Sequence, residues 1–373
     1  MMSNQKEADS EEDVEIALRV LSRGFIDLHQ AVRAGEIVDP YSLPQTMGDG
    51  MRLLSRLCVK AGAEDIGDSI HSLSDIARRL PVGEWGVPQF GVPFRFAEAK
   101  LLTAEPVAPT EECRALASKG GGADGILEGV HHLQLREIVQ RVRSQSRLQI
   151  YSVLRERIVR KPVYERRELS GFLEDEGVVA ADEVMRQWSI DIPLGALRRN
   201  GSFAICANCG ALLYPHRDTN RFPDGRCKIG PCREEVPSST AGQIVADAAG
   251  WRVFKDDILA YWVGPGQAEV RLYDALRRGG IDVQLYPRDD AADVGRTSEL
   301  GIDVKSYACP RLLGDTLSER LGGLTTFDER YVAIPDAIVN RRPGYLEDLR
   351  YAYRGPTSVV FGRVSEVAAR ILG

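Results

Sequence analysis

The chain has 373 residues, of which 43% are hydrophobic and 27% charged, and its formal net charge is −6. This length allows two or three domains with separate cores. The acidic balance argues against a protein that coats nucleic acid by bulk charge, so any phosphate binding must depend on a local patch. No apolar run approaches the roughly 20 residues of a membrane span, and the N-terminus is acidic, unlike a signal peptide. We therefore expect a cytoplasmic protein with no membrane partner.

The N-terminal third has the pattern of a helical bundle. Residues 1–12 are polar and are expected to form a disordered tail. Apolar residues then recur at helical spacing over 14–32, and similar patterns follow over 43–61 and 65–79. These segments predict a helical bundle over 13–110 that ends in an irregular, aromatic-containing connection. An apolar stripe that docks a partner helix is the alternative use of the same pattern.

The next segment, 124–200, is helical in pattern and rich in arginine. One interpretation is a helix-turn-helix-like surface that contacts DNA phosphates. The other is a solvated helix face whose arginines pair with acidic residues of the N-terminal part. The candidate phosphate-binding residues are Arg141, Arg143, Arg147, Arg155 and Lys161.

Four of the seven cysteines are grouped within residues 201–237. They are Cys206, Cys209, Cys227 and Cys232. The Cys-Ala-Asn-Cys-Gly run is typical of a zinc knuckle, and four thiolates suit a closed, structural Zn²⁺ site. An iron–sulfur cluster is the alternative, and His216 could replace one ligand. The grouping favours metal over disulfides and predicts a zinc ribbon that binds nucleic acid or protein, or that clips two domains together.

The C-terminal segment, 240–373, alternates helices and strands in the order α-β-β-β-α-β, which predicts a mixed sheet flanked by helices. Residues 281–309 predict a strand and a hairpin that turns near Ser298. This register would place Asp293 opposite Asp303, with Cβ atoms roughly 5 Å apart. Lys305 would project from the same face.

Two neighbouring carboxylates repel each other unless a cation lies between them. A hard divalent ion such as Mg²⁺ is the usual cation, and a lysine beside it can position a water. The alternative is an ordinary solvated strand end without a function, because Asp-x-Lys tripeptides are common.

These residues resemble the core of PD-(D/E)xK nucleases, with Asp293 as the first acid and Asp303-x-Lys305 as the second acid and lysine. Asp290 is the alternative first acid. More narrowly, the Leu-Tyr-Pro strand end, the acidic loop and Asp-Val-Lys resemble the restriction-endonuclease-like proteins associated with the pPIWI-RE module of prokaryotic defence. The resemblance covers about the last third of the chain and the metal-binding segment before it. It also makes Glu269, on the preceding helix, a candidate metal-linked acid, although an exposed glutamate there would more often be solvated.

The resemblance implies a multidomain protein with an α-helical N-terminal half, a zinc ribbon and a restriction-endonuclease-like (αβββαβ) domain. The implied function is a DNA endonuclease that uses Mg²⁺ or Mn²⁺ against phage or plasmids, beside a PIWI-like protein and a helicase. One alternative is an inactive nucleic-acid-binding or scaffold subunit of a defence complex. Another is a zinc-ribbon transcription regulator.

Overall fold

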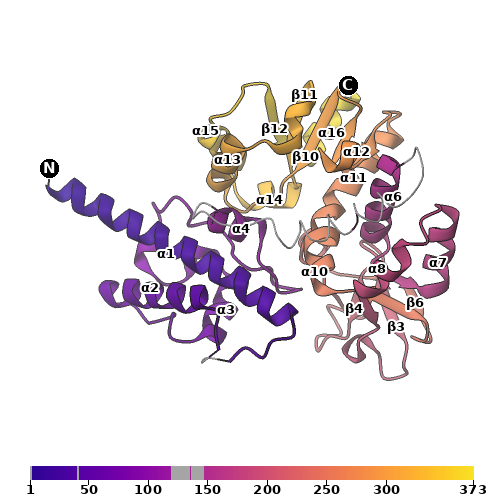
Figure 1. Ribbon diagram of the computed structural model, residues 1–373, viewed down its shortest axis with the longest axis horizontal. Coiled ribbons are helices and arrows are strands. Elements are labelled where there is room, and N and C mark those ends of the chain that lie inside the picture. The colour runs from indigo at the N-terminus through magenta and orange to yellow at the C-terminus, as the bar shows by residue number, and fades with distance from the viewer. Residues whose placement is uncertain (1, 40–41, 119–134, 136–146) are drawn as a thin grey trace. The chain divides into compact units, whose positions relative to one another are not determined.

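The computed structural model describes residues 2–39, 42–118, 135 and 147–373, and the chain divides into two compact units (Figure 1). Unit 1 is made of Met1–Ile126, Ser306–Arg320 and Gly344–Gly355. Unit 2 is made of Leu127–Lys305, Leu321–Pro343 and Pro356–Gly373. None of the described helices is both long and apolar enough to cross a membrane.

Unit 1 is helical. Its helices are α1 (Met2–Arg33), α2 (Gln45–Ala61), α3 (Ile70–Arg79), α4 (Glu111–Ser118), α13 (Pro310–Glu319) and α15 (Tyr345–Ala352). Helix α1 packs against α2 and α4, with Leu18, Leu21 and Phe25 in the core. A glycine allows the close approach of α1 to α2, because a Cβ added at Gly24 would lie 2.6 Å from the Cα of Met47.

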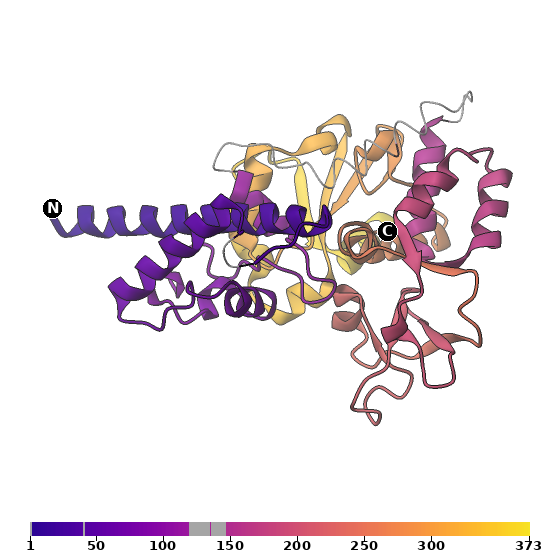
Figure 2. The ribbon, with the colours of Figure 1, turned by 60° about the horizontal axis from the view of Figure 1, so that its bottom comes forward.

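Helix α1 is 32 residues long and begins at Met2. Figure 2 shows it as the long indigo helix at the N-terminus. The structure therefore has a helix where the sequence predicted a disordered tail over 1–12. The residue types explain the difference, since Glu, Gln, Lys and Ala are good helix formers.

The connection between α3 and α4 is irregular and well packed, as predicted. It contains the short 3-10 helices η1 (Val82–Glu84) and η2 (Pro88–Phe90). A chain of aromatic contacts fills it, with ring centroids 5.9 Å apart for Trp85 and Phe90 and 5.7 Å apart for Phe90 and Phe94.

The first part of unit 2 is a three-stranded sheet with helices beside it. Its elements are α6 (Arg147–Arg160), β1 (Val163–Glu165), α7 (Arg166–Asp175), α8 (Ala181–Gln187), β2 (Ser189–Asp191) and β7 (Trp251–Phe254). The strand order is β1-β7-β2, with both pairs antiparallel. Residues 192–250 form a long insertion between β2 and β7, which are neighbouring strands of this sheet.

The insertion contains the second sheet, in the order β5-β4-β3-β6. Its elements are β3 (Phe203–Cys206), β4 (Leu212–Tyr214), β5 (Arg226–Cys227), α9 (Gly230–Glu235) and β6 (Ala241–Val245). Neighbouring strands are antiparallel throughout. This small sheet carries all four grouped cysteines.

The third sheet is mixed, in the order β12-β11-β10-β9-β8. Its strands are β8 (Gln284–Leu285), β9 (Val294–Arg296), β10 (Leu300–Val304), β11 (Glu329–Ile334) and β12 (Val359–Arg363). Strands β8, β9 and β10 pair antiparallel, whereas β10, β11 and β12 pair parallel. Helices α10 (Asp256–Ile258), α11 (Gly264–Arg278), α12 (Pro287–Asp290), α14 (Asp336–Arg341) and α16 (Val364–Leu372) also belong to unit 2.

The predicted helical N-terminal half and C-terminal mixed sheet are present, but the compact units do not follow the 240–373 boundary. Helices α13 and α15 of that segment lie in unit 1. The buried Glu112 carboxylate on α4 explains part of this, because it accepts the backbone N–H of Cys309 at 2.7 Å and that of Lys100 at 3.0 Å. These bonds hold the start of α13 among the N-terminal helices.

Candidate metal centres

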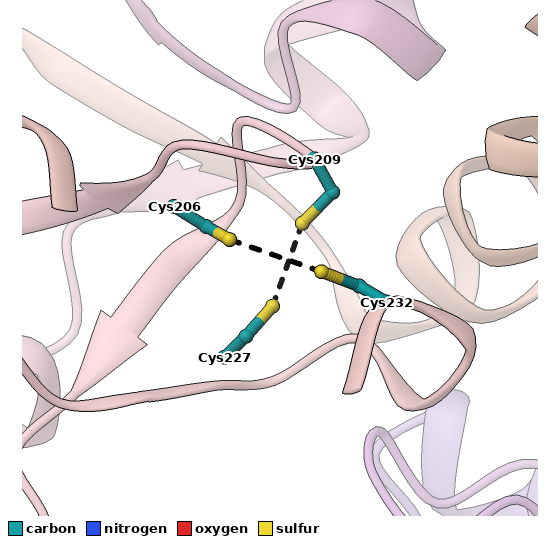
Figure 3. A group of neighbouring side chains, drawn as sticks. All are labelled: Cys206, Cys209, Cys227 and Cys232. Carbon is teal, nitrogen blue, oxygen red and sulfur yellow. Dashed lines mark hydrogen bonds between the residues drawn. The ribbon is translucent and has the colours of Figure 1, made fainter. Parts of the chain in front are cut away.

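The cysteine cluster consists of Cys206, Cys209, Cys227 and Cys232, all buried. Their Sγ atoms lie within 4.8 Å of one another and converge on one point (Figure 3). The turn after β3 makes this possible, because Gly210 adopts a φ of 70° and its N–H bonds to the carbonyl of Cys206 at 3.0 Å. A residue with a side chain would be strained there. The four thiols could therefore hold one tetrahedral metal ion such as Zn²⁺.

Hydrogen-bond donors around the sulfurs fit a thiolate set. The Asn208 side-chain amide donates to Sγ of Cys232 at 3.2 Å, and the Ile229 N–H donates to Sγ of Cys227 at 3.4 Å. Such donors stabilise negative charge on a metal-bound sulfur. All seven cysteines are free thiols. The alternative ligand, His216, is not in the cluster, and its ring lies instead 4.7 Å from that of Phe222.

The carboxylate centre comprises Glu269, Asp293, Asp303 and the adjacent Lys305. The predicted hairpin register is confirmed, since Arg296 pairs with Leu300 and Val294 with Ile302. Extended by one residue, the same register places Asp293 opposite Asp303. The Lys305 Nζ lies 3.5 Å from Oδ2 of Asp303.

Three hydrogen bonds to backbone groups hold Asp293. Its N–H donates to the carbonyl of Ile302 at 3.1 Å, and its carbonyl accepts the N–H of Tyr286 at 2.8 Å. Its Oδ2 accepts the N–H of Val304 at 2.7 Å. The carboxylate is thus fixed in orientation by the Val304 N–H.

Glu269 comes from α11 and is 3% exposed. Its nearest cation is the Arg155 guanidinium on α6, at 3.7 Å between Nη2 and Oε2. Arg155 also forms a hydrogen-bonded ion pair with Asp290 and lies 4.0 Å from the centroid of the Tyr286 ring. Within the described part of the chain, Oε2 of Glu269 and the Tyr286 hydroxyl are both buried without a hydrogen bond of normal geometry, and the hydroxyl lies near enough to lower the pKa of Glu269. Asp290 is therefore neutralised by Arg155, which favours Asp293 as the first acid.

Burial raises the pKa values of the three acids in this centre, and repulsion between the carboxylates adds to the rise. Burial raises the pKa of Glu269 to about 7, and the Arg155 charge acts against this rise. Burial also raises the pKa of Asp293 well above its usual value, and the charges of Glu269 and Asp303 add to the effect. The pKa of Asp303 is raised by burial and partly restored by Lys305.

When ionised, the four carboxylates of Glu269, Asp290, Asp293 and Asp303, together with the cations of Arg155 and Lys305, have a formal charge of −2. One divalent cation would neutralise it. The orphaned oxygen of Glu269 and this excess charge both fit such an ion. Among the described residues, only the four cysteines already have ligand atoms close enough to share an ion, so the carboxylates would have to draw together around one.

The candidate phosphate-binding residues are largely engaged in other contacts. Arg155, a predicted phosphate contact, is 5% exposed, and its guanidinium is buried against Asp290 and Tyr286. Lys161 is exposed and pairs with Glu168. Arg141 and Arg143 lie outside the described residues, and Arg147 begins α6 but its side chain is not among those described.

Neighbouring arginines are paired as well. Arg160 binds Glu156 and Asp274, and Arg157 binds Glu168. These partners lie in unit 2 and not in the N-terminal helices that the sequence interpretation named. The described part of the basic stretch is therefore mostly charge-compensated within unit 2.

The sequence did not predict that Arg155 pairs with Asp290 and lies against the Tyr286 ring. Arg155 lies in a run of surface-like arginines, and its partner Asp290 is 135 residues away. No local pattern marks such a pair. A weak signal was available, because Arg155 lies four residues after the apolar Tyr151 and three before Ile158, on a face that is buried.

Comparisons with known families agree with this arrangement. Residues 266–371 match the family described as "REase associating with pPIWI_RE". Residues 17–165 match the family described as "pPIWI_RE three-gene island domain Y". Neither the curated proteins nor the solved structures contained a match. Both family matches associate the chain with the pPIWI-RE module.

Proposed function

We propose that this chain, a restriction-endonuclease-like protein of the pPIWI-RE module, is a metal-dependent endonuclease that hydrolyses phosphodiester bonds in DNA. One observation carries the proposal: Glu269, Asp293 and Asp303 form a carboxylate centre with an excess of negative charge and an adjacent lysine. These residues lie within the segment that matches the endonuclease-type family.

Glu269, Asp293 and Asp303 would hold one Mg²⁺ or Mn²⁺ ion, for which hard oxygen ligands are suited. When bound, the ion supplies positive charge that polarises the scissile phosphate and lowers the pKa of a water. The protein fixes Asp293 through the Val304 N–H, so that this carboxylate does not need to reorganise.

Lys305 is the most accessible member of the centre, with its side chain 28% exposed. Its ammonium lies beside Asp303 and can donate a hydrogen bond to a water or to a phosphate oxygen. We assign to it the orientation of the attacking water and the stabilisation of negative charge that develops on the phosphate.

The cysteine cluster has a separate role in this proposal. Its four buried sulfurs leave no open ligand position, so we assign to it a structural Zn²⁺. The ribbon then serves to hold the insertion between β2 and β7 in shape. Arg217 and Arg221 on its exposed loop are candidates for DNA contact.

The setting follows from the family descriptions. One names association with pPIWI_RE and the other a three-gene island, which supports partners encoded in the same island. We propose a PIWI-like protein and a helicase as these partners, and defence against phage or plasmids as the process. Cytoplasmic action is part of this proposal.

A specific observation favours a second candidate, an inactive DNA-binding or scaffold subunit. Arg155 already supplies a cation between Glu269 and Asp290. If that arginine satisfied the site in place of a metal, the chain would keep the fold without the chemistry. A zinc-ribbon transcription regulator has no comparable support.

The test is cleavage of supercoiled plasmid and of single-stranded DNA with Mg²⁺ or Mn²⁺, with and without the proteins of the same island. We expect metal-dependent cleavage that Asp303→Asn and Lys305→Ala each reduce by about 100-fold or more. Asp282→Asn is the matched control, because Asp282 is exposed and pairs only with Arg277 in the described contacts. Cleavage that persists in both variants would place the activity outside this centre. Absence of cleavage in wild type with its partners present would favour the scaffold role.

A further inference from the structure

The carboxylate centre receives residues from both family-matched segments. Arg155 belongs to the segment that matches domain Y, whereas Glu269, Tyr286 and Asp290 belong to the endonuclease-type segment. Helix α6, which carries Arg155, lies beside α11 and α12 (Figure 1). Domain Y thus reaches into the site through one helix.

Three neighbouring positions on α6 hold the loop that leads to Asp293. The Ser152 hydroxyl donates to the carbonyl of Tyr286 at 3.0 Å, and the Tyr151 hydroxyl donates to Asp290 at 3.3 Å. Arg155 pairs with Asp290 and stacks on Tyr286. One face of α6 therefore contacts both ends of the 286–290 loop.

This loop has an unusual backbone. Tyr286, Arg288 and Asp290 have φ values of 51°, 56° and 71°, in the left-handed region that non-glycine residues rarely adopt. Such conformations persist only where surrounding contacts enforce them, and they concentrate at functional sites. The contacts from α6 hold Tyr286 and Asp290, together with the bond of the Tyr286 N–H to Asp293 and that of the Arg288 side chain to the carbonyl of Thr326.

Arg155 makes different contacts with its two acidic partners, Asp290 and Glu269. It is hydrogen-bonded to Asp290, whereas its contact with Glu269 is a 3.7 Å ion pair that leaves Oε2 of Glu269 without a hydrogen bond. The guanidinium therefore neutralises one carboxylate and leaves a coordinating oxygen on the other.

We propose that Arg155 is a positioning residue of the endonuclease centre: it neutralises Asp290 and holds the 286–290 loop, so that a divalent cation is directed to Glu269, Asp293 and Asp303. This inference rests on the proposed function, because it assumes that the carboxylate centre binds the ion. It assigns to domain Y the task of setting which acids remain available to the metal.

Charge determines the expected effects. Arg155→Met would change the formal charge of the surrounding acids from −2 to −3 and release Asp290 as a competing ligand. Asp290→Asn would change it to −1 and leave the guanidinium to Glu269 alone. The double variant would restore −2.

The experiment measures Mn²⁺ affinity of the zinc-loaded full chain by calorimetry, together with plasmid cleavage. We expect Arg155→Met to bind Mn²⁺ about tenfold more tightly, because an opposing charge is removed, yet to cleave at least about tenfold more slowly, because the ion is misplaced. Asp290→Asn should bind Mn²⁺ about tenfold more weakly. The double variant should return within about threefold of wild-type affinity.

Arg160→Met is the matched control, since Arg160 is on the same helix and pairs with Glu156 and Asp274 outside the centre. Arg155→Lys keeps the charge but loses the stacking on Tyr286, so it should change Mn²⁺ affinity less than Arg155→Met does. A merely structural role would lower affinity and cleavage together, and circular dichroism would report the lost structure. If Arg155→Met does not fold, the opposite shift in Asp290→Asn and its reversal in the double variant still decide the matter.

Two failures remain distinguishable. If Asp293→Asn and Asp303→Asn both bind Mn²⁺ like wild type, the ion site and the proposed function are wrong. If those variants lose Mn²⁺ binding while the affinities of Arg155→Met and Asp290→Asn equal that of wild type, only the role of Arg155 is overturned.

Discussion

The cysteine cluster and the carboxylate centre could each hold a cation, but the carboxylate centre also depends on an arginine far away in the chain. Cys206 and Cys232 are 26 residues apart, whereas Arg155 and Asp290 are 135 residues apart. The sulfurs already lie within 4.8 Å of one another, whereas a backbone N–H fixes the Asp293 carboxylate and Arg155 pairs with Asp290 and Glu269. A local, closed set suits a structural metal, and a dispersed set with unsatisfied oxygen suits an ion that must admit a substrate.

The largest effect that would sharpen this contrast is loss of the cysteine cluster. Cys232→Ser should remove the metal and unfold the ribbon, at a cost of about 5 kcal/mol or more, because metal binding and folding are coupled in such small modules. Metal content and thermal unfolding would measure this loss. Cys58→Ser is the control, since Cys58 is a buried thiol outside the cluster. Equal stability of the two variants would contradict a structural metal.

Loss of a ligand in the carboxylate centre should lower metal affinity without lowering the stability of the metal-free chain. Glu269→Gln should weaken Mn²⁺ binding by about 100-fold, or about 3 kcal/mol, because it removes one charged ligand. Thermal unfolding of the metal-free chain should not fall, since a buried carboxylate with an unbonded oxygen is itself unfavourable. Calorimetry and unfolding of the same samples test both statements. Glu168→Gln, at an exposed ion pair, should leave Mn²⁺ binding unchanged.

Glu112 in unit 1 is a buried carboxylate outside both candidate metal centres. Its expected effect on stability is smaller and depends on pH. Burial raises its pKa to about 7, although two backbone N–H groups bond to it. The folded state therefore holds its proton more tightly than the unfolded state. The stability from this group is full below about pH 4.5 and falls, by at most about 3 kcal/mol, as the pH rises to about 7.

Urea unfolding of wild type and Glu112→Gln between pH 4.5 and 8 would measure this dependence. The slope in that window should be shallower in the variant, with Mn²⁺ affinity unaffected. Parallel pH profiles for the two proteins would contradict the assignment.

The smallest predicted effect concerns the surroundings of the cysteine cluster. Asn208→Ala removes the donor to Sγ of Cys232 and should weaken zinc affinity by about tenfold. Competition with a chromophoric chelator measures this change. Asn220→Ala, on the exposed loop of the same ribbon, should not alter zinc affinity.

Local sequence patterns were sufficient for the features that depend on nearby residues. The Cys-x-x-Cys-Gly run predicted the cysteine cluster, and alternation about Ser298 predicted the hairpin register. The aromatic connection after α3 was also confirmed. In each of these cases the interacting residues are close in the chain, so spacing alone carries the geometry.

Features that depend on residues far apart in the chain could not be predicted from the sequence. The arginine run that includes Arg155 does not reveal which arginine is buried, because that depends on Asp290 and Tyr286 in another segment. The apolar faces of α13 and α15 indicate that these helices are packed, but not that they pack in unit 1. The N-terminal extension of α1 was missed because polarity outweighed helix propensity in the interpretation.

The passage of the chain between the units has a consequence for biosynthesis. Unit 1 includes Gly344–Gly355 and unit 2 includes Pro356–Gly373, so neither unit has all its residues until the last part of the chain leaves the ribosome. Ribosomal synthesis delivers N-terminal segments first, at about 5–20 residues per second. Strands β11 and β12, which complete the sheet beside Asp303, emerge late in that sequence. A nascent chain would therefore carry the segment that matches domain Y and the cysteine cluster for some seconds before it could assemble the sheet that supports the carboxylate centre.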